Sequence, residues 1–263
     1  MSTAPKIRIR GLCKAFGSKV VLDGVDLDIE KGTSMVVIGG SGTGKSVLLR
    51  CILGLIEPDA GTIEIDGQNI LTMSRLQQEA IRRQIGMLFQ NAALFDSMSV
   101  GDNIAFGLIA KQDKSPKTRL SRSQVTDMTG ELLTQVGMDP SVGSLSPSEL
   151  SGGMQKRVGL ARAIAGQPEI LFFDEPTTGL DPIMGAVIDG LIVDCVQKLG
   201  STALTITHDM ASAQRIGDQA AMLYRGKIVW QGKASDLMHS GNPYVDQFTH
   251  GRREGPISME LRK

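Results

Sequence analysis

The segment from residue 39 to residue 46 restricts what this chain can fold into more than any other part of its 263 residues. It fits the phosphate-loop pattern, whose fixed places are Gly39, Gly44, Lys45 and Ser46, with Gly40, Ser41, Gly42 and Thr43 between them. The aliphatic run Met35–Ile38 before it predicts a buried strand, and Ser46–Leu53 after it predicts a helix. Backbone N–H groups of such a glycine-rich loop can surround phosphate oxygens at the positive end of the helix. The sequence therefore predicts a nucleotide site, in which Lys45 reaches the β- and γ-phosphates and Ser46 offers its hydroxyl to Mg²⁺.

A second aliphatic run ends in two acidic residues. Ile170–Phe173 predicts another buried strand, and Asp174 and Glu175 follow it directly. In open α/β sheets, ligands bind at the carboxyl ends of the strands, so we expect these carboxylates beside the phosphate loop. We expect Asp174 to hold Mg²⁺ and Glu175 to orient and deprotonate the water that attacks the γ-phosphate.

Strand and helix patterns alternate along most of the chain, which predicts an α/β fold with a parallel sheet. We expect one domain over residues 1–240, with a P-loop NTPase core at about 1–90 and 167–240, which the family resemblance given below implies to be RecA-like, and an antiparallel β subdomain made by the early strands. Residues 91–166 have a mostly helical pattern, and we interpret them as an α-helical lobe inserted into the core. The tail, residues 241–263, is expected to lie as a C-terminal extension on a surface or on a partner.

Charge and hydropathy exclude several classes of protein. The 28 Lys and Arg residues balance 28 Asp and Glu residues, whereas a general nucleic-acid binder needs a basic excess, so we expect no nucleic-acid partner. No apolar run approaches about 18 residues, and residues 1–10 contain no apolar segment of the signal-peptide type. We therefore expect neither a transmembrane helix nor a secretory signal.

A third motif, Leu150-Ser151-Gly152-Gly153-Met154-Gln155, opens a helix that the pattern predicts over Ser148–Ala165. Ser151 is a favourable N-cap, and the two glycines leave the helix N-terminus accessible to an anion. This motif lies far along the chain from Lys45, in the predicted helical lobe, so one chain carries two phosphate-seeking elements. The simplest arrangement that uses both is a head-to-tail pair of chains, in which each chain completes the nucleotide site of the other.

Together the three motifs resemble those of the ATPase subunits of ABC transporters, over about residues 6–240. The resemblance implies that ATP and Mg²⁺ are bound, that ATP is hydrolysed, and that the ATP-bound protein is a homodimer. It implies that Ser151, Gly152 and Gly153 close on the γ-phosphate held by the other subunit.

The resemblance also implies roles for four residues outside these motifs. Gln90 would contact Mg²⁺ or the attacking water and sense the membrane partner, and His208 would contact the γ-phosphate. Asp181 would be the acid of a loop that crosses to the other subunit. Phe16 stands where the family stacks an aromatic ring on adenine, although tyrosine is commoner there, and the alternative is a phenylalanine of the core.

Narrower stretches are similar to the Mla-type ATPases, which drive phospholipid transport with MCE-domain lipid-binding proteins between bacterial inner and outer membranes. The similar stretches are 89–100, 102–106, 158–164, 175–183, 247–251 and 255–257. This similarity implies an integral-membrane permease, an MCE-domain protein and a STAS-type regulatory subunit as partners, with the chain peripheral on the cytoplasmic face of the inner membrane. A groove beside Gln90–Val100 would receive a coupling helix of the permease, and Leu94, Phe95 and Met98 are either its apolar anchors or residues packed within the lobe.

Other functions stay open at this point. The ATPase of an amino-acid or other small-solute importer shares most core motifs but usually lacks this tail. A soluble ABC protein of translation carries two ATPase units in one chain, and one of DNA maintenance carries a long heptad region, so the length and spacing here disfavour both. A nucleotide-binding scaffold without turnover is disfavoured by Glu175, because an inactive site would have lost its base.

Overall fold

The computed structural model describes residues 4–110 and 120–258 and divides into two compact units. The first unit comprises residues 1–73 and 204–263, and the second comprises residues 74–203. This division groups the strands β6 (Ile85–Leu88) and β7 (Ile170–Asp174) with the helices of the second unit. The predicted boundaries of a helical lobe at 91–166 and an extension at 241–263 therefore stay a prediction.

The first unit contains an antiparallel sheet with the strand order β2-β1-β4-β5. β1 (Ile7–Phe16) pairs with β2 (Lys19–Ile29) on one side and with β4 (Ala60–Ile65) on the other, and β4 pairs with the short β5 (Gln68–Asn69). Ile7 and Ile9 of β1 are fully buried while Arg8 between them is not, which is the alternation of a sheet with one covered face. The predicted antiparallel subdomain is thus confirmed.

A second group of strands in the first unit has the order β10-β9-β3-β8. β3 (Ser34–Ile38) is parallel to β9 (Gln219–Tyr224), and β9 is antiparallel to β10 (Lys227–Lys233). All of β3 and all of β8 (Thr202–Thr207) are buried, as the continuous aliphatic run of β3 predicts for a strand covered on both faces. The helical elements of this unit are α1 (Lys45–Ile52), η1 (Ile70–Thr72), α7 (Met210–Ile216), η5 (Ala234–His239) and α8 (Pro243–Thr249).

The described part of the C-terminal tail is ordered against the first unit. Asn242 caps α8 by accepting from the backbone N–H of Tyr244 at 3.0 Å, and Val245 of α8 is fully buried. The Gln247 side chain, also buried, accepts from Ile257 N at 2.7 Å and donates to Ile257 O at 3.1 Å. These bonds fold residues 250–257 back onto α8.

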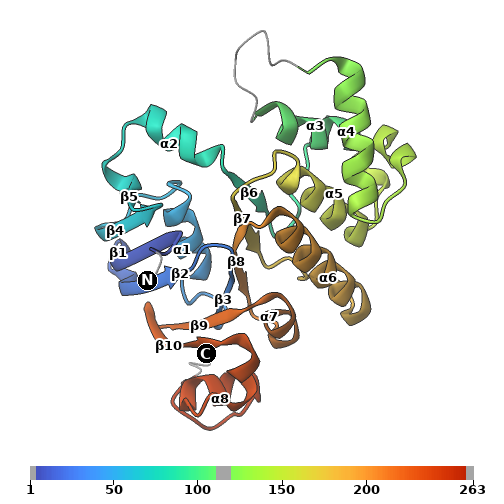
Figure 1. The fold of residues 1–263 in the computed structure, drawn as a ribbon. Helices are drawn as coiled ribbons and strands as arrows, with labels where there is room; N and C mark the ends of the chain where they lie inside the picture. Colours follow the sequence, from blue (N-terminus) through green and yellow to red (C-terminus); the bar gives the residue numbers. More distant parts are fainter. Residues whose placement is uncertain (1–3, 111–119, 259–263) are drawn as a thin grey trace. The chain divides into compact units, whose positions relative to one another are not determined.

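The second unit contains two parallel strands and most of the long helices. β6 (Ile85–Leu88) pairs with β7 (Ile170–Asp174). The helices α3 (Val100–Ala110), α4 (Arg122–Gln135) and α5 (Gly152–Ile164) pack on one another, and α6 (Pro182–Leu199) packs on α5 (Figure 1). The remaining elements are α2 (Arg75–Arg82), η3 (Pro140–Ser144) and η4 (Pro147–Glu149). This combination of strands and helices confirms the predicted α/β class.

The predicted helix over Ser148–Ala165 is wrong at its start. Residues 147–149 form the separate turn η4, and α5 begins only at Gly152, with Ser151 in extended conformation as its N-cap. Pro147 and the Ser151 cap each favour the start of a helix over its continuation. The chain therefore forms the short turn η4 first and begins α5 separately after it.

Two glycines bring backbone close to α5. A Cβ on Gly86 of β6 would overlap the carbonyl oxygen of Ala163, and a Cβ on Gly107 of α3 would lie 2.5 Å from that of Arg162. The backbones of β6 and α3 therefore pack directly against the end of α5.

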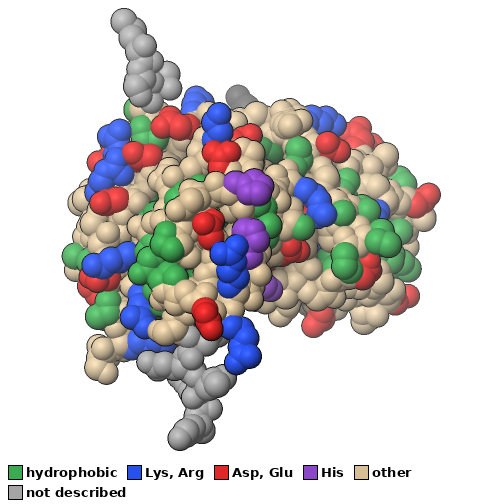
Figure 2. Space-filling model, turned by 90° about the horizontal axis from the view of Figure 1, so that it is seen from below, with side chains coloured by type: hydrophobic (Ala, Val, Ile, Leu, Met, Phe, Trp, Pro, Cys, Tyr) green, Lys and Arg blue, Asp and Glu red, His purple; other side chains and the backbone are tan. Residues whose placement is uncertain are grey.

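Acidic and basic side chains are interspersed over the face shown in Figure 2, as expected from their equal numbers. Within residues 4–110 and 120–258, no helix combines the length and the apolar character needed to cross a bilayer.

Candidate functional site

The phosphate loop connects β3 to α1 in the first unit. Gly44 is the N-cap of α1, so Lys45 and Ser46 lie in the first turn of this helix. The ammonium group of Lys45 is buried within the loop, where it donates to the carbonyl oxygens of Gly39 at 2.7 Å and Gly40 at 2.9 Å. Thr43 also donates to Gly40 O, at 2.9 Å, which closes the loop on itself. Residues 39–46 therefore form one turn that leads into a helix N-terminus, and the binding of an anion there stays a prediction.

The loop has no room for side chains at two of its glycines. Gly44 has φ 106°, and a Cβ there would lie 2.9 Å from the carbonyl oxygen of Val21. Gly39 has φ 155°, and a Cβ there would overlap the carbonyl oxygen of Leu223. Both positions therefore require glycine, and the bare backbone that results is what a phosphate group needs for close approach.

Phe16 and His208 are the other predicted site residues in the first unit. Phe16 ends β1 with 50% of its surface exposed, and the Lys14 ammonium lies 5.5 Å from the centre of its ring. The alternative of a core phenylalanine is therefore wrong, because a core ring would be covered. His208 is exposed directly after β8, and Asp209 beside it caps α7 through bonds from Ala211 N and Ser212 N.

Gln90 and Glu175 meet in the second unit. Gln90 follows β6 and Glu175 follows β7, and these strands are parallel neighbours, so both residues leave the same edge. Gln90 Nε2 donates to Glu175 Oε2 at 3.1 Å, and Thr178 Oγ1 donates to the same oxygen at 3.0 Å. Glu175 has φ 45°, a conformation that residues with a side chain rarely adopt. Its carboxylate is thus held at the strand end by two donors and by an unusual backbone turn.

Asp174 is the last residue of β7 and is half-buried. Its carboxylate and the Gln90 amide oxygen are donors of the oxygen type that Mg²⁺ prefers, and the Ser46 hydroxyl of the phosphate loop is a donor of the same type. The residues present therefore fit this metal.

Lys156 is a buried cation beside Glu175 that the sequence analysis did not identify. It lies on α5, and its ammonium donates to the carbonyl oxygen of Gln90 and, at 3.4 Å, to that of Glu175. Burial lowers the pKa of Lys156, while the negative charges of Asp174 and Glu175 act to raise it. No sequence signal marks it, because a lysine five residues after a helix cap is usually solvated. Thr178 was also missed, although its place three residues after Glu175 suits a turn bond.

The third motif forms the exposed N-terminus of α5. Ser151 accepts from the backbone N–H of Met154 at 3.3 Å, and Ser151 and Gly152 are exposed. Gly153 is buried against Met184 of α6, where a Cβ would lie 3.0 Å from Met184 Cγ. The predicted N-cap is therefore confirmed.

Asp181 is exposed, and its carboxylate accepts from Ile183 N at 3.0 Å and Met184 N at 2.9 Å at the start of α6. Asp181 is therefore a helix cap in this chain, whatever further contact it makes.

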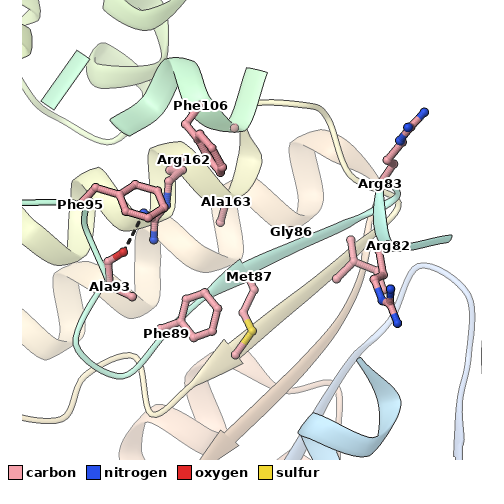
Figure 3. Close-up of a pocket in the computed structure, with 12 residues that line it drawn as sticks. Arg82, Arg83, Gly86, Met87, Phe89, Ala93, Phe95, Phe106, Arg162 and Ala163 are labelled. Carbon is pink, nitrogen blue, oxygen red and sulfur yellow. Dashed lines mark hydrogen bonds between the residues drawn. The ribbon is translucent and has the colours of Figure 1, made fainter. Parts of the chain in front are cut away.

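An apolar pocket of about 510 Å³ lies in the second unit, beside the segment that follows Gln90 (Figure 3). Its walls carry three phenylalanines that are 38–47% exposed, namely Phe89, Phe95 and Phe106, together with Met87. Phe95 and Phe106 meet edge to face with ring centres 5.1 Å apart. Of the three predicted anchors, Phe95 lines the pocket, and Leu94 and Met98 do not.

Arg162 of α5 holds the wall of this pocket in place. Its guanidinium donates to Ala92 O at 2.6 Å and Ala93 O at 2.8 Å and lies 5.8 Å from the centre of the Phe95 ring. Ala92 and Ala93 have φ 57° and 47°, so this bend is strained and needs such support.

Comparison with known proteins gives consistent matches. The family model described as ABC transporter matches residues 22–178. The "Probable ribonucleotide transport ATP-binding protein mkl" of Mycobacterium leprae (strain TN) is 41% identical over 257 residues, covering 98% of this chain and 72% of that protein. The "Intermembrane phospholipid transport system ATP-binding protein MlaF" of Escherichia coli (strain K12) is 38% identical over 256 residues, covering 97% and 93%.

A plant relative and a solved structure extend this result. "Protein TRIGALACTOSYLDIACYLGLYCEROL 3, chloroplastic" of Arabidopsis thaliana is 41% identical over 267 residues, covering 95% of this chain and 75% of that protein. The dimeric structure of a post-hydrolysis state of the ATP-binding cassette MJ0796 bound to ADP and Pi superimposes with a TM-score of 0.78 at 29% identity, covering 87% and 98%.

Proposed function

This chain belongs to the ABC transporter family as an ATP-hydrolysing subunit, and from that premise we propose that it drives phospholipid transport between two membranes. The observation that carries the proposal is the similarity to the intermembrane phospholipid transport protein over 97% of this chain and 93% of that protein. Coverage this high includes most of the tail after residue 240, and the described part of that tail forms α8 and the bonds of Gln247.

The phosphate loop is the proposed binding site for ATP. Lys45 exchanges its bonds to Gly39 O and Gly40 O for the β- and γ-phosphates, whose charge outcompetes neutral carbonyls. The exposed ring of Phe16 stacks on adenine, and His208 contacts the γ-phosphate. Ser46, Asp174 and Gln90 are the proposed ligands of Mg²⁺, which when bound neutralises charge that develops on the phosphates.

Glu175 is the proposed general base. The donors on Oε2 fix the carboxylate, which is proposed to accept the proton of the attacking water. Gln90 touches the base through its side chain and leads along the chain into the pocket wall, so it is placed to report the state of a partner to the base.

A second copy of the chain is proposed to supply Ser151, Gly152 and Gly153 to the γ-phosphate, with Asp181 in the crossing loop. The exposed N-terminus of α5 supports this role, because free N–H groups at a helix start attract an anion. The dimeric state of the superimposed cassette also supports it.

The pocket with the three phenylalanines is proposed to receive the coupling helix of an integral permease. Exposed aromatic rings around a concave wall are typical anchors of a helix-in-groove interface. Through this contact the chain would lie on the cytoplasmic face of the inner membrane, with an MCE-domain protein on the other side and a STAS-type subunit as regulator.

A second candidate is the transport of a small solute, because one 41% identical relative is named for ribonucleotide transport. Purification of the tagged chain from its native membranes, followed by mass spectrometry of proteins and extracted lipids, separates the two. Phospholipid transport predicts a permease and an MCE-domain protein with bound phospholipid. Recovery of a permease with a solute-binding protein and no MCE-domain protein would reject the lipid assignment and leave the ATPase assignment intact.

A further inference from the structure

We propose that Lys156 is a positioning residue that ties the signature helix α5 to the two polypeptide segments carrying Gln90 and Glu175. The proposal rests on the proposed function, since it takes Glu175 as the base and Ser151 to Gly153 as the residues that contact the γ-phosphate of the ATP bound by the partner. It adds a residue that joins these two parts within one chain.

The contacts of Lys156 are made to backbone, at the places where the two segments turn. Its ammonium donates to Gln90 O, directly after the pocket-lining Phe89, and to Glu175 O, in the residue with positive φ after β7. The side chain of Lys156 is 5% exposed. A buried ammonium is costly unless its donors are satisfied, so the two carbonyl groups are held to it rather than to water.

The same contacts fix the catalytic carboxylate indirectly. Glu175 receives its side-chain donors from Gln90 and Thr178, and Lys156 holds the main chain of both Glu175 and Gln90. The carboxylate and its amide partner are therefore positioned from one point on α5. Positioning of reacting groups is a large part of catalysis, so loss of this point affects turnover rather than binding.

Lys156 also lies on the same rigid helix as the signature. Ser151 caps α5, and Lys156 follows within the first two turns. A displacement of α5 when Ser151 engages the partner's nucleotide is thus passed to Gln90 and Glu175 of its own chain. Lys156 in this way couples the two sites of the dimer.

The test compares Lys156→Met, which keeps length and burial but removes the donors, with Lys156→Arg, which keeps a cationic donor. Arg157→Met is the matched control, because Arg157 is the next cation on α5 and donates instead to Gly137 O at 2.9 Å. We expect Lys156→Met to lower kcat by about 10-fold or more, with the Kd for a fluorescent ATP analogue changed by less than about twofold. Lys156→Arg should recover much of kcat, and Arg157→Met should stay near the parent.

A double variant shows whether Lys156 acts through Glu175. If it does, Lys156→Met added to Glu175→Gln lowers the residual rate by no more than about twofold, because the group that it positions is already gone. Full additivity of the two losses, or parent-like kcat in Lys156→Met, overturns the proposal. Where Lys156→Met fails to fold by circular dichroism, Lys156→Gln replaces it under the same criteria.

The same set distinguishes this proposal from the assignment of the base. Normal hydrolysis by Glu175→Gln alone rejects Glu175 as the base and the proposed mechanism with it. An inactive Glu175→Gln beside a parent-like Lys156→Met rejects only the role of Lys156.

Discussion

The side-chain amide of Gln90 donates to the carboxylate of Glu175 over 3.1 Å. One member of this pair is the proposed base, and the other is joined along the chain to the pocket proposed for the permease. A single hydrogen bond thus connects the proposed catalytic carboxylate to the segment that leads into the proposed permease-binding pocket.

Replacement of Glu175 by Gln should separate binding from turnover. The amide keeps the size of the side chain but cannot take a proton, so the steady-state rate should fall at least about 100-fold. ATP binding should persist, because the phosphate loop is intact. Phosphate release measured beside equilibrium binding of ATP checks this prediction, and a rate within a few-fold of the parent would contradict it.

Replacement of Phe16 by Ala should weaken ATP binding without destabilising the protein. The ring is half exposed, so its loss removes little core packing, whereas loss of stacking on adenine costs about 1 kcal/mol, or about fivefold in Kd. Val20→Ala is the matched control, since Val20 is 62% exposed on the neighbouring strand. Calorimetric titration with ATP measures the effect, and equal affinities of the two variants would remove Phe16 from the site.

Replacement of Phe106 by Ala should weaken assembly with the permease. Phe106 is 47% exposed and supports the ring of Phe95, and aromatic residues at the centre of an interface commonly contribute about 2 kcal/mol or more. The yield of permease that copurifies with the tagged chain is the measurement. Leu76→Ala, at a residue 78% exposed on α2 and outside the pocket lining, should leave that yield unchanged.

Replacement of Asn103 by Ala should destabilise the second unit. This fully buried amide accepts from Phe95 N at 2.8 Å and donates to Phe95 O, Met98 O and Ser99 O at 3.0–3.3 Å. Its loss takes away the acceptor of Phe95 N and a fully buried side chain, while Phe95 O and Ser99 O keep their backbone donors, so the free energy of unfolding should fall by about 2–3 kcal/mol. Urea titration of this variant is compared with that of Asn91→Ala, whose side chain is exposed and whose midpoint should match the parent.

Two of the three cysteines should resist alkylation. Burial raises the pKa of Cys51 and of Cys195 from about 9 to about 11, so near pH 8 both are almost wholly neutral thiols, and the neutral thiol does not react. Because the folded state holds these protons more tightly than the unfolded state, their contribution to the free energy of unfolding is complete below about pH 9. It decreases as the pH rises toward about 11. Mass spectrometry after brief treatment with iodoacetamide at pH 8 should find label at Cys13 alone, and label at all three in denaturant.

The phosphate loop, the buried strands and the N-cap at Ser151 were predictable because each depends on residues close together in the sequence. The predicted start of α5 is too early, because η4 directly precedes α5 and helical periodicity alone does not mark the break between them. Lys156 could not be predicted, because its burial depends on where the ends of β6 and β7 come to lie. The ordered tail after α8 was missed in detail for the same reason, as it depends on the buried Gln247 side chain.

The direct backbone contacts at Gly86 and Gly107 have a mechanical consequence. Where two elements contact each other through side chains, a small displacement of one element can be taken up by rotamer changes. Where main chain contacts main chain, no side chain can change rotamer, so the second element is displaced with the first. A displacement of the pocket wall that carries the three phenylalanines would therefore also displace Ser151 at the other end of α5. Alanine at either glycine would push β6 or α3 away from α5 and loosen this transmission of movement.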